Sequence, residues 1–194
     1  NDITEYVTDG EHITPKRSES GILLLSARNV HNGRISLNRV DYIPESEYQR
    51  ISKRLKIEID DVLLSCSGTV GRCCVLEENL KFSLVRSVAV LRPFLKMGKF
   101  LSYAIRSPQV QTQINHKKKN TAQSNIFQNQ IRSLLIPLPP LLEQKKIVSI
   151  LDKRISEFSS IDKKINELVI RKKNAMTYLN HIQSSIIDSA FSGK

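Results

Sequence analysis

The chain has 194 residues, 40% of them hydrophobic, which is enough for one compact core with an extended arm and argues against disorder of the whole chain. Its 30 Lys and Arg residues outnumber its 19 Asp and Glu residues, and the formal net charge of +11 favours an anionic polymer as partner. The sequence shows no long apolar run, no leader segment and no paired cysteine spacing, so we expect a cytoplasmic protein without membrane spans, a disulfide framework or a zinc site.

The first forty residues predict strands separated by turns. Ile22–Leu25 is an apolar run, Asn32-Gly33 is a hairpin dipeptide, and Ile35–Val40 alternates between apolar and polar residues. These patterns predict adjacent strands over Ile22–Val40. The polar residues between them would then share one loop: Arg28, Asn29, His31, Asn32 and Arg34.

The next segment predicts a helix and three strands. Pro44 favours a short helix over Glu45–Arg50. Ile57–Ser65 and Val70–Leu76 are rich in residues that favour strands, with the turn Ser67-Gly68-Thr69 between them, and Phe82–Leu91 predicts one further strand.

A helix is predicted over Lys99–Ile114, with Pro108 expected to kink or divide it. Its inward residues would be Phe100, Tyr103, Ala104, Val110 and Ile114. A basic run, His116–Lys119, follows, and after it comes the polar segment Asn120–Asn125. Such a segment is most often a solvated loop, but lysines neutralise phosphates while Asn and Gln pair with adenine edges, so it also fits a loop that reads a DNA duplex.

A proline hinge then leads into a long helix. Ile136–Asp152 reads IPLPPLLEQKKIVSILD, and the residues from Leu141 to Phe191 contain no Pro or Gly. Apolar residues recur at alternating steps of four and three, with Arg154, Lys172 and Ser189 as interruptions, and this spacing predicts a coiled-coil seam. The seam consists of Ile147, Leu151, Phe158, Ile161, Ile165, Leu168, Ala175, Leu179, Ile182 and Ile186.

A seam this regular requires a partner helix. The alternative is a helix packed along its own domain, but at 1.5 Å per residue this helix would be about 75 Å long, which exceeds what the head could cover.

Catalytic and metal-binding patterns are not evident. Ser67–Gly71 lacks the lysine of a phosphate-binding loop and the third glycine of a dinucleotide-binding loop, and it lies between strands, unlike the KH loop of RNA-binding domains. The four histidines are dispersed, and the adjacent carboxylates Asp60-Asp61 and Glu77-Glu78 fit solvated turns. A nuclease would need an acidic cluster with a lysine on neighbouring strands, and the sequence does not indicate one.

Several segments together resemble the specificity subunits of type I restriction-modification enzymes. They are the hinge IPLPPLLEQKKIVSILD, the closing IDSAFSGK of Ile187–Lys194, SGILLLSARNVHNGRI of Ser20–Ile35, IDDVLLSCSGTVGRCCV of Ile59–Val75, and KNTAQSNI ending at Ile126. The resemblance spans nearly the whole chain. Asn120 stands where the family often has Gly, and Asn tolerates the same left-handed backbone.

The resemblance implies an α+β fold, with a β-rich target-recognition domain over residues 1–136, a proline hinge over 137–140 and a long coiled-coil helix over 141–194. It implies a non-catalytic subunit that reads double-stranded DNA and directs adenine methylation and restriction. The helix would set the spacing between two half-sites and dock the modification subunits, which carry S-adenosylmethionine, while the restriction subunit joins that assembly. This chain itself would bind no cofactor and no metal.

Family members usually carry two recognition domains and two such helices, whereas this chain has one of each. Two alternatives follow. Either the chain is a half-subunit that forms a homodimer through the long helix, antiparallel to a second copy, or it is a fragment of a longer chain.

Candidate DNA-binding residues come from the expected loops. They are Lys16, Arg17, Arg28, Asn29, His31, Arg34, Ser67, Thr69, Arg72, Lys117, Lys118, Lys119, Thr121 and Gln123. Each has a structural alternative: Asn29 can hold its own turn, Thr69 can close a hairpin, and Arg72 can lie along a strand. The alternative function is a coiled-coil adaptor whose basic head binds protein or RNA.

Overall fold

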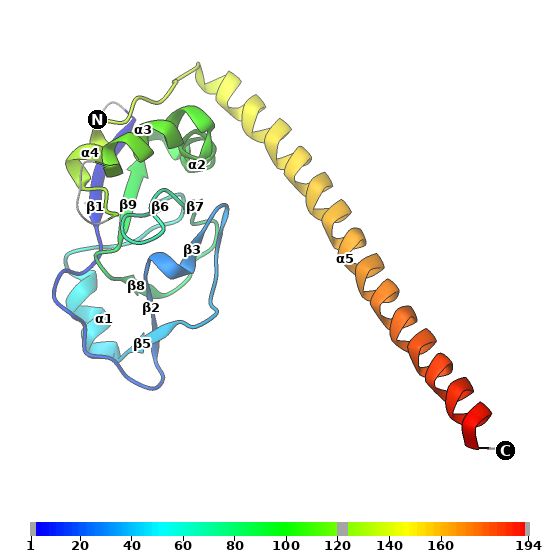
Figure 1. Ribbon diagram of the computed structural model, residues 1–194. Coiled ribbons are helices and arrows are strands. Elements are labelled where there is room, and N and C mark those ends of the chain that lie inside the picture. Colours follow the sequence, from blue (N-terminus) through cyan, green and yellow to red (C-terminus); the bar gives the residue numbers. More distant parts are fainter. Residues whose placement is uncertain (1–2, 120–123, 193–194) are drawn as a thin grey trace. The chain divides into compact units, whose positions relative to one another are not determined.

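The computed structural model describes residues 3–119 and 124–192, and the chain divides into two compact units, Asn1–Val148 and Ser149–Lys194 (Figure 1). Thr121, Gln123 and the predicted turn at Asn120 lie outside the described residues. Within the described residues, no helix combines the length and apolarity needed to cross a membrane. The α+β class is confirmed: the first unit combines sheets with helices, and a long helix ends the chain.

A four-stranded antiparallel sheet forms the centre of the first unit. Its strand order is β1 (Thr4–Asp9), β9 (Val88–Pro93), β6 (Val62–Ser65) and β7 (Cys73–Val75). All four residues of β6 are buried, because both faces of this strand are covered. This double coverage explains why the segment has continuous apolar residues instead of alternating ones.

Helices cover one face of this sheet. On that face Val62 and Leu64 of β6 join a core cluster with residues of α2 (Gly98–Arg106) and α3 (Pro108–Lys119). Pro108 divides the two helices as predicted, since Ser107 has an extended backbone with φ −62° and ψ 147°. Of the predicted inward residues, Phe100, Val110 and Ile114 are buried, whereas Tyr103 and Ala104 are half-buried.

A second sheet packs near the other face, where Leu63 and Val90 share a core cluster with Leu25 and Leu84. Its order is β5 (Asp41–Ile43), β2 (Ile22–Leu25) and β8 (Phe82–Leu84), with β2 antiparallel to β5 and parallel to β8. The helix α1 (Glu45–Ser52) follows Pro44 as predicted, and its Ile51 packs against Leu24 and Ile43 of this sheet.

Two strand predictions were wrong. The single strand predicted over Phe82–Leu91 is two strands in different sheets, separated by a turn in which the Val88 amide donates to the Val85 carbonyl at 3.1 Å. The partner of β2 is Asp41–Ile43 rather than Ile35–Val40. The intervening residues form a 3-10 helix, η1 (Ala27–Asn29), and a two-stranded ribbon of β3 (Val30–His31) and β4 (Arg34–Ile35), which turns at Asn32-Gly33 as expected.

A buried ion pair fixes the start of β6. Asp61 is 1% exposed, and its carboxylate accepts hydrogen bonds from Arg92 Nε at 2.8 Å and Arg92 Nη2 at 2.7 Å. It also accepts one from the Glu58 amide at 2.8 Å. Three charge-assisted hydrogen bonds thus compensate the desolvation of this carboxylate.

The junction between the central sheet and α2 is equally tight. Asp60 accepts a hydrogen bond from the Gly98 amide at 2.9 Å, at the first residue of α2. A β-carbon at Gly98 would lie 2.2 Å from the Asp60 carbonyl oxygen. Only glycine therefore fits at this position without displacing the backbone.

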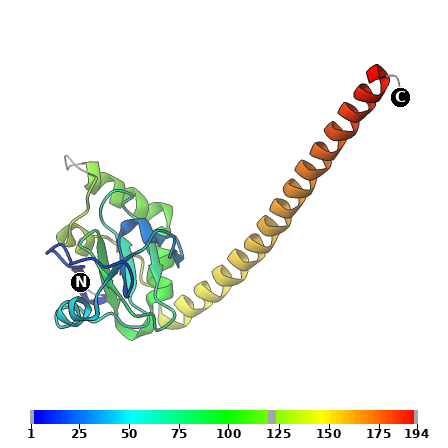
Figure 2. The ribbon, with the colours of Figure 1, turned by 90° about the horizontal axis from the view of Figure 1, so that it is seen from below.

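Two short elements complete the first unit: the 3-10 helix η2 (Phe94–Lys96) and the helix α4 (Gln128–Arg132). The last element of the chain is the helix α5 (Leu141–Ser192), which has 52 residues. At 1.5 Å per residue α5 is about 78 Å long. Its first turn follows Pro139 and Pro140, and the Pro140 carbonyl accepts from the Glu143 amide at 2.9 Å. Figure 2 shows α5 as one uninterrupted helix.

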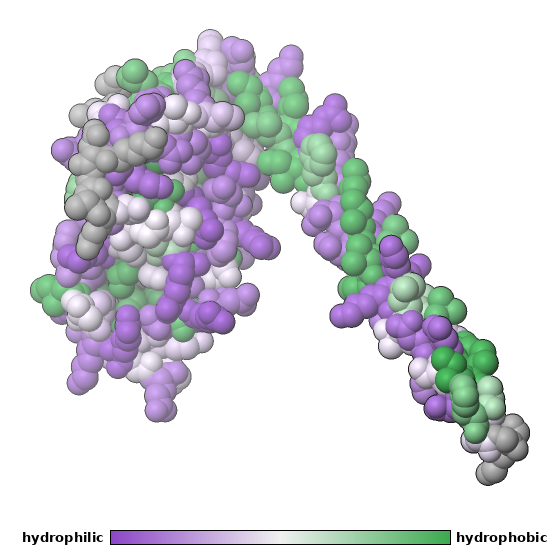
Figure 3. All heavy atoms as spheres, viewed as in Figure 1, coloured by the Kyte–Doolittle hydropathy of each residue, from purple (hydrophilic) through white to green (hydrophobic). Residues whose placement is uncertain are grey.

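The predicted seam lies along α5 as an uncovered apolar stripe (Figure 3). Ile147 and Leu151 are half-buried, and the remaining eight predicted members are exposed. Among these, Phe158 is 70% and Leu168 is 62% exposed. An apolar stripe of this length is unfavourable in water.

Candidate nucleic-acid interface

A tight turn between β6 and β7 presents Ser67 and Thr69. The Ser65 hydroxyl donates to the Thr69 carbonyl and accepts from the Arg72 amide at 3.0 Å, and both ends of the turn are thereby held by one buried side chain. Gly68 and Gly71 adopt φ +71° and +96°, as the turn requires. Thr69 is exposed, and Ser67 is half-buried.

The β3–β4 ribbon docks beside this turn. The Gly33 amide donates to the Cys73 carbonyl at 2.9 Å, and the Cys73 amide donates to Asn32 Oδ1 at 3.3 Å. His31 and Arg34 are cross-strand neighbours on the ribbon. The structure thus brings His31 and Arg34 close to Arg72, which immediately precedes β7.

Two predicted arginines share one carboxylate on β5. Arg28 Nη2 lies 2.7 Å from Asp41 Oδ2, and Arg17 Nη2 lies 3.4 Å from the same atom. Both arginine side chains remain about half exposed or more, Arg28 at 49% and Arg17 at 62%. Asp41 therefore orients two cations on the surface and offsets part of their charge, while Lys16 is exposed.

The lysine run lies on a helix rather than in a loop, which corrects the expectation. Helix α3 continues through Lys119, so Lys117 and Lys118 belong to its last turns. Carbonyls at a helix C-terminus carry partial negative charge and stabilise lysines there. This explains how a segment without apolar anchors remains helical.

After residue 123 the chain returns to the Ser67 turn. Ser67 and Asn125 form an antiparallel bridge, and the Ile126 amide donates to the Cys66 carbonyl at 2.9 Å. Ile126 is 2% exposed and anchors the returning segment in the core. The segment that follows α3 in the chain, from Asn125 on, is therefore held against the turn that presents Thr69.

The prediction for Asn29 was wrong, because this residue is fully buried at 0% exposure. Its Oδ1 accepts from the Ser26 amide at 3.0 Å, and its Nδ2 donates to the Ser36 carbonyl at 2.9 Å. The Asn29 side-chain amide stabilises the turn before β3 and is not accessible to a ligand. The residue therefore holds its own turn, which was the alternative to DNA binding.

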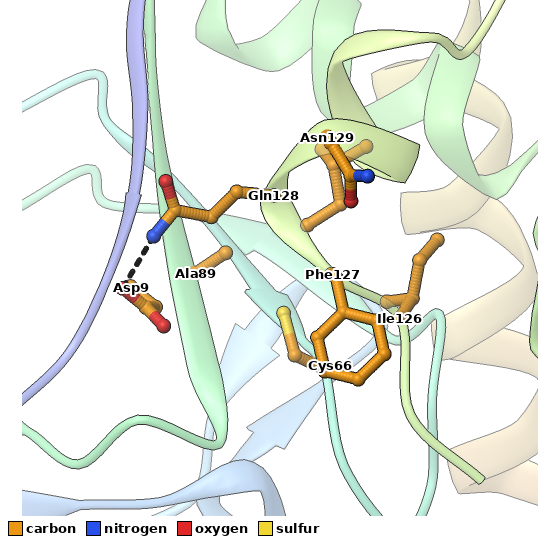
Figure 4. Close-up of a pocket in the computed structure, with 8 residues that line it drawn as sticks. Asp9, Cys66, Ala89, Ile126, Phe127, Gln128 and Asn129 are labelled. Atoms are coloured by element: carbon orange, nitrogen blue, oxygen red, sulfur yellow. Dashed lines mark hydrogen bonds between the residues drawn. The ribbon is translucent and has the colours of Figure 1, made fainter. Parts of the chain in front are cut away.

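A small pocket beside the returning segment contains residues that the sequence did not single out (Figure 4). Gln128 Nε2 donates to Asp9 Oδ1 at 2.6 Å on one side of it, whereas Asn129 points away from Asp9. Phe127 is 55% exposed. The run Gln128-Asn129-Gln130 could have indicated these residues, because it is rich in side-chain amides like the polar segment Asn120–Asn125 before it.

Three further cations lie along the open edge of β1. Arg54 Nη2 donates to the Gly10 carbonyl at 2.6 Å, and Arg132 Nη2 donates to the Val7 carbonyl at 2.5 Å. Lys56 lines the same hollow and is 81% exposed. No sequence pattern predicted these contacts. Arg54 lies 45 positions after Asp9, the last residue of β1. Arg132 belongs to α4, a helix of only five residues.

The candidate residues that remain accessible give the first unit a polar surface with several cationic side chains. Within the residues that the structure describes, no three His, Cys, Asp or Glu side chains converge on a possible metal position. The three cysteines are buried and free. Burial raises the pKa of the Cys66 thiol to about 12, that of Cys73 to about 11 and that of Cys74 to about 12.

These thiols should resist alkylation in the folded chain. At pH 8 a pKa near 11 or 12 leaves less than about one thiol in a thousand ionised, and the thiolate is the nucleophile. We expect labelling by a maleimide to be slow at pH 8 and fast in urea, with the native rate rising about tenfold for each pH unit above 8, in step with the thiolate fraction. Rapid stoichiometric labelling of the native chain at pH 8, monitored by mass spectrometry, would contradict this burial.

Comparison with known proteins gives a consistent result. Residues 18–170 match the model of the type I restriction modification DNA specificity domain. The chain is 28% identical over 178 residues to the EcoBI specificity subunit of Escherichia coli, covering 91% of this chain and 36% of that protein. It is 27% identical over 185 residues to the putative MjaX specificity subunit of Methanocaldococcus jannaschii, covering 92% and 43%.

Solved structures share the fold. A structure described as the basis of complex assembly and conformational transition of the type I R-M system has a TM-score of 0.57 and 21% identity, covering 95% of this chain and 43% of that one. The HsdS subunit from Thermoanaerobacter tengcongensis has a TM-score of 0.54 and 20% identity, covering 84% and 37%. This chain thus spans 36% to 43% of the length of these relatives.

Proposed function

Because the chain belongs to the family of type I restriction-modification DNA specificity domains, we propose that it reads one half of an interrupted double-stranded DNA sequence for a methyltransferase and endonuclease complex. It contributes recognition and no catalytic group of its own. It acts in the cytoplasm, where it meets DNA.

The observation that supports this proposal is the bridge from Ser67 to Asn125, which holds the segment after α3 against the Thr69 turn. Polar side chains on that turn can reach base edges, and the lysines at the end of α3 can neutralise phosphates. Candidate contacts are the residues that remain accessible on these loops. They are Lys16, Arg17, Arg28, His31, Arg34, Ser67, Thr69, Arg72, Lys117 and Lys118, with Lys119, Thr121 and Gln123 retained from the sequence.

The long helix serves assembly. A second copy of the chain covers the stripe of α5, so that two heads read two half-sites and the helix sets the distance between them. The apolar face is wider than a two-helix seam, since Ile155, Val169 and Met176 each follow a seam position and are 39%, 60% and 52% exposed. This additional width supports docking of modification subunits, which supply S-adenosylmethionine and methylate adenine, and the restriction subunit joins them.

Methylation mapping tests the function in cells. DNA is sequenced for adenine methylation from cells that express this chain with its modification subunits and from cells that express those subunits alone. We expect a new methylated motif only when the chain is present, and a palindromic interrupted motif if two copies act together. Association with the modification subunits without any new motif would favour the adaptor that binds protein or RNA, or a fragment that lacks its second recognition domain.

Two substitutions separate base reading from phosphate binding. Lys118→Ala should weaken binding to all duplexes and lower the salt slope by about one, because one phosphate contact is lost. Gln123→Ala should change the preference among sequences, by about 1–3 kcal/mol at one base pair. Binding is measured by fluorescence anisotropy over a salt series, with Lys163→Ala on α5 as the control that should bind like the unmodified chain. Equal losses on every sequence for both variants would contradict the assignment.

A further inference from the structure

The open edge of β1 borders a hollow that gathers four cations. β1 is an edge strand of the central sheet (Figure 1), and the hollow beside it is lined by Arg54, Lys56, Arg92 and Arg132 among others. None of the described residues that line this hollow is acidic. Like charges that share a surface repel one another, so this arrangement gains free energy when an anion binds between them.

Two of these cations already have an anionic neighbour. Arg92 donates to the buried Asp61 carboxylate at 2.7 and 2.8 Å, which takes up its charge. Lys56 lies 3.7 Å from Glu58 and is 81% exposed, and an exposed pair at this distance contributes little. The Lys56 ammonium is therefore still able to turn toward a ligand.

Arg54 and Arg132 are held by backbone carbonyls of the β1 segment instead. Arg54 Nη2 donates to the Gly10 carbonyl at 2.6 Å, and Arg132 Nη2 donates to the Val7 carbonyl. Among the described residues, no carboxylate lies within ion-pair distance of either guanidinium. A guanidinium has five N–H donors in a rigid fork, so fixing one Nη2 orients the donors that remain. Two oriented cations lose little conformational freedom when they bind an anion.

The backbone of β1 supplies two further donors at this edge. The Gly10 amide donates to the Val88 carbonyl of β9 at 2.9 Å, and successive residues of a strand direct their amides to opposite sides. The amides of Val7 and Asp9 therefore point to the open edge, as do their carbonyls, which accept from the two arginines. Backbone N–H groups beside guanidiniums are donors well suited to an oxyanion.

The Asp9 carboxylate lies outside this hollow. Its Oδ1 accepts from Gln128 Nε2 at 2.6 Å and lies 3.0 Å from His12 Nε2. Figure 4 shows Asp9 turned toward Gln128 at the other pocket, which both residues line. Hydrogen-bond partners already surround this carboxylate, so its repulsion of an anion at the β1 edge is weakened.

The hollow also lies beside the cationic end of α3. Gln130 of α4 donates through Nε2 to the Lys117 carbonyl at 3.4 Å, so α4 contacts the last turns of α3, and Arg132 is the last residue of α4. At 1.5 Å per residue α4 is about 7.5 Å long, and a DNA strand carries one phosphate for about each 3.4 Å of the duplex axis. Cations at the two ends of α4 therefore suit phosphates of one strand.

We propose that the hollow at the β1 edge binds a phosphate group, held by the guanidiniums of Arg54 and Arg132 and by the outward amides of β1. Lys56 adds its charge at the rim. The backbone of a bound duplex and phosphate free in solution can both supply such a group, and the position beside α3 favours the backbone. This inference rests on DNA recognition in the proposed function and adds a phosphate contact outside the loops predicted from the sequence.

Loss of both arginines should weaken DNA binding without changing the sequence preference. Arg54→Gln with Arg132→Gln is expected to raise the dissociation constant about tenfold for every duplex and to lower the salt slope by about one, because one phosphate contact is lost. The control, Lys53→Gln with Lys81→Gln, removes the same charge from two exposed residues that do not line the hollow. It should change the dissociation constant by less than about twofold at about 0.15 M salt, where charges beyond contact are screened.

Fluorescence anisotropy measures binding of the full chain and of both double variants. Slow thiol alkylation at pH 8 shows that each variant is folded, because the native cysteines are buried.

Neutralising single phosphates locates the contact on the duplex. In duplexes that carry the motif found by methylation mapping, one phosphate at a time is replaced by a neutral methylphosphonate. We expect one position at which this change weakens binding of the unmodified chain and of the lysine control about tenfold, but leaves binding of the double arginine variant unchanged. Such coupling identifies the phosphate that the two arginines hold.

Inorganic phosphate tests the site without DNA. Its addition to the full chain should shift the amide NMR signals of Val7 and Asp9, and Arg54→Gln with Arg132→Gln should abolish the shift. A shift without any coupled position on the duplex would assign the site to free phosphate. Equal affinities of the two double variants together with unshifted amides would overturn the site. A chain that shows the shift but binds no duplex would reject the proposed function and retain the phosphate site.

Discussion

Replacing Asp61 with alanine should lower the free energy of unfolding of the first unit by about 3 kcal/mol, because the partly buried guanidinium of Arg92 would keep only the exposed Glu58 carboxylate, at 3.4 Å, as an ionic partner. Arg92 is 18% exposed at its side chain and would lose both hydrogen bonds to Asp61. The Glu58 amide would lose its acceptor as well. The ion pair between Asp61 and Arg92 is therefore expected to contribute more to the free energy of unfolding than an ion pair on the surface.

The measurement uses the buried cysteines as reporters. The chain has no Trp, and the helical signal of α5 would obscure unfolding of the first unit in far-ultraviolet circular dichroism. Alkylation of Cys66, Cys73 and Cys74 along a urea series reports this unit alone.

Matched variants decide the cause of the effect. Glu77→Ala removes an exposed carboxylate paired with Lys99 at 3.3 Å and should change stability by no more than about 1 kcal/mol. Asp61→Leu with Arg92→Met should regain most of the stability, because no unpaired charge remains. An Asp61→Ala variant that unfolds at the same urea concentration as Glu77→Ala would show that the pair is dispensable.

Ile165→Asp should separate the paired copies, with an increase in their dissociation constant of about a thousandfold. Ile165 lies at the middle of the seam and is 51% exposed in the single chain, so the carboxylate is solvated in the monomer and desolvated in the pair. Two such carboxylates would lie near each other in an antiparallel pair. Methylation of a palindromic motif should be lost together with pairing.

The control adds the same charge elsewhere on the helix. Ser156→Asp lies on the face of α5 opposite the seam, is exposed, and should leave pairing and methylation unchanged. Sedimentation velocity over a concentration series measures both variants. Unaltered association of Ile165→Asp would mean that the copies do not meet along this stripe.

The sequence predicted the elements whose signals are local or long. The 52-residue helix α5 has a periodic stripe and a proline start, and the division at Pro108 follows from one residue type. Both signals depend on neighbours along the chain. For the same reason the Asn32-Gly33 turn was predicted correctly.

The errors arose where distant contacts decide the structure. Phe82–Leu91 is apolar on both sides of Arg86-Ser87, and only the assignment of β8 and β9 to different sheets reveals the turn. Strand β1 and helix α4 were not predicted, because one is a single edge strand and the other has five residues.

The sequence identified the segments that form the candidate site, but not which of their residues are accessible. The Ser67 turn, the ribbon and the lysine run were identified, but the burial of Asn29 depends on hydrogen bonds to Ser26 and Ser36 that composition does not indicate. The cations along β1 come from α4 and from the segment after α1, and only folding brings them together.

The arginines along β1 have a consequence for the behaviour of the chain in concentrated solution. An edge strand whose outward carbonyls are unpaired is a template for strand addition by another chain, which leads to aggregation. Arg54 and Arg132 already bond the carbonyls of Gly10 and Val7, so an incoming strand would have to displace two guanidiniums and approach their charges. The edge is thereby protected against strand addition by another copy.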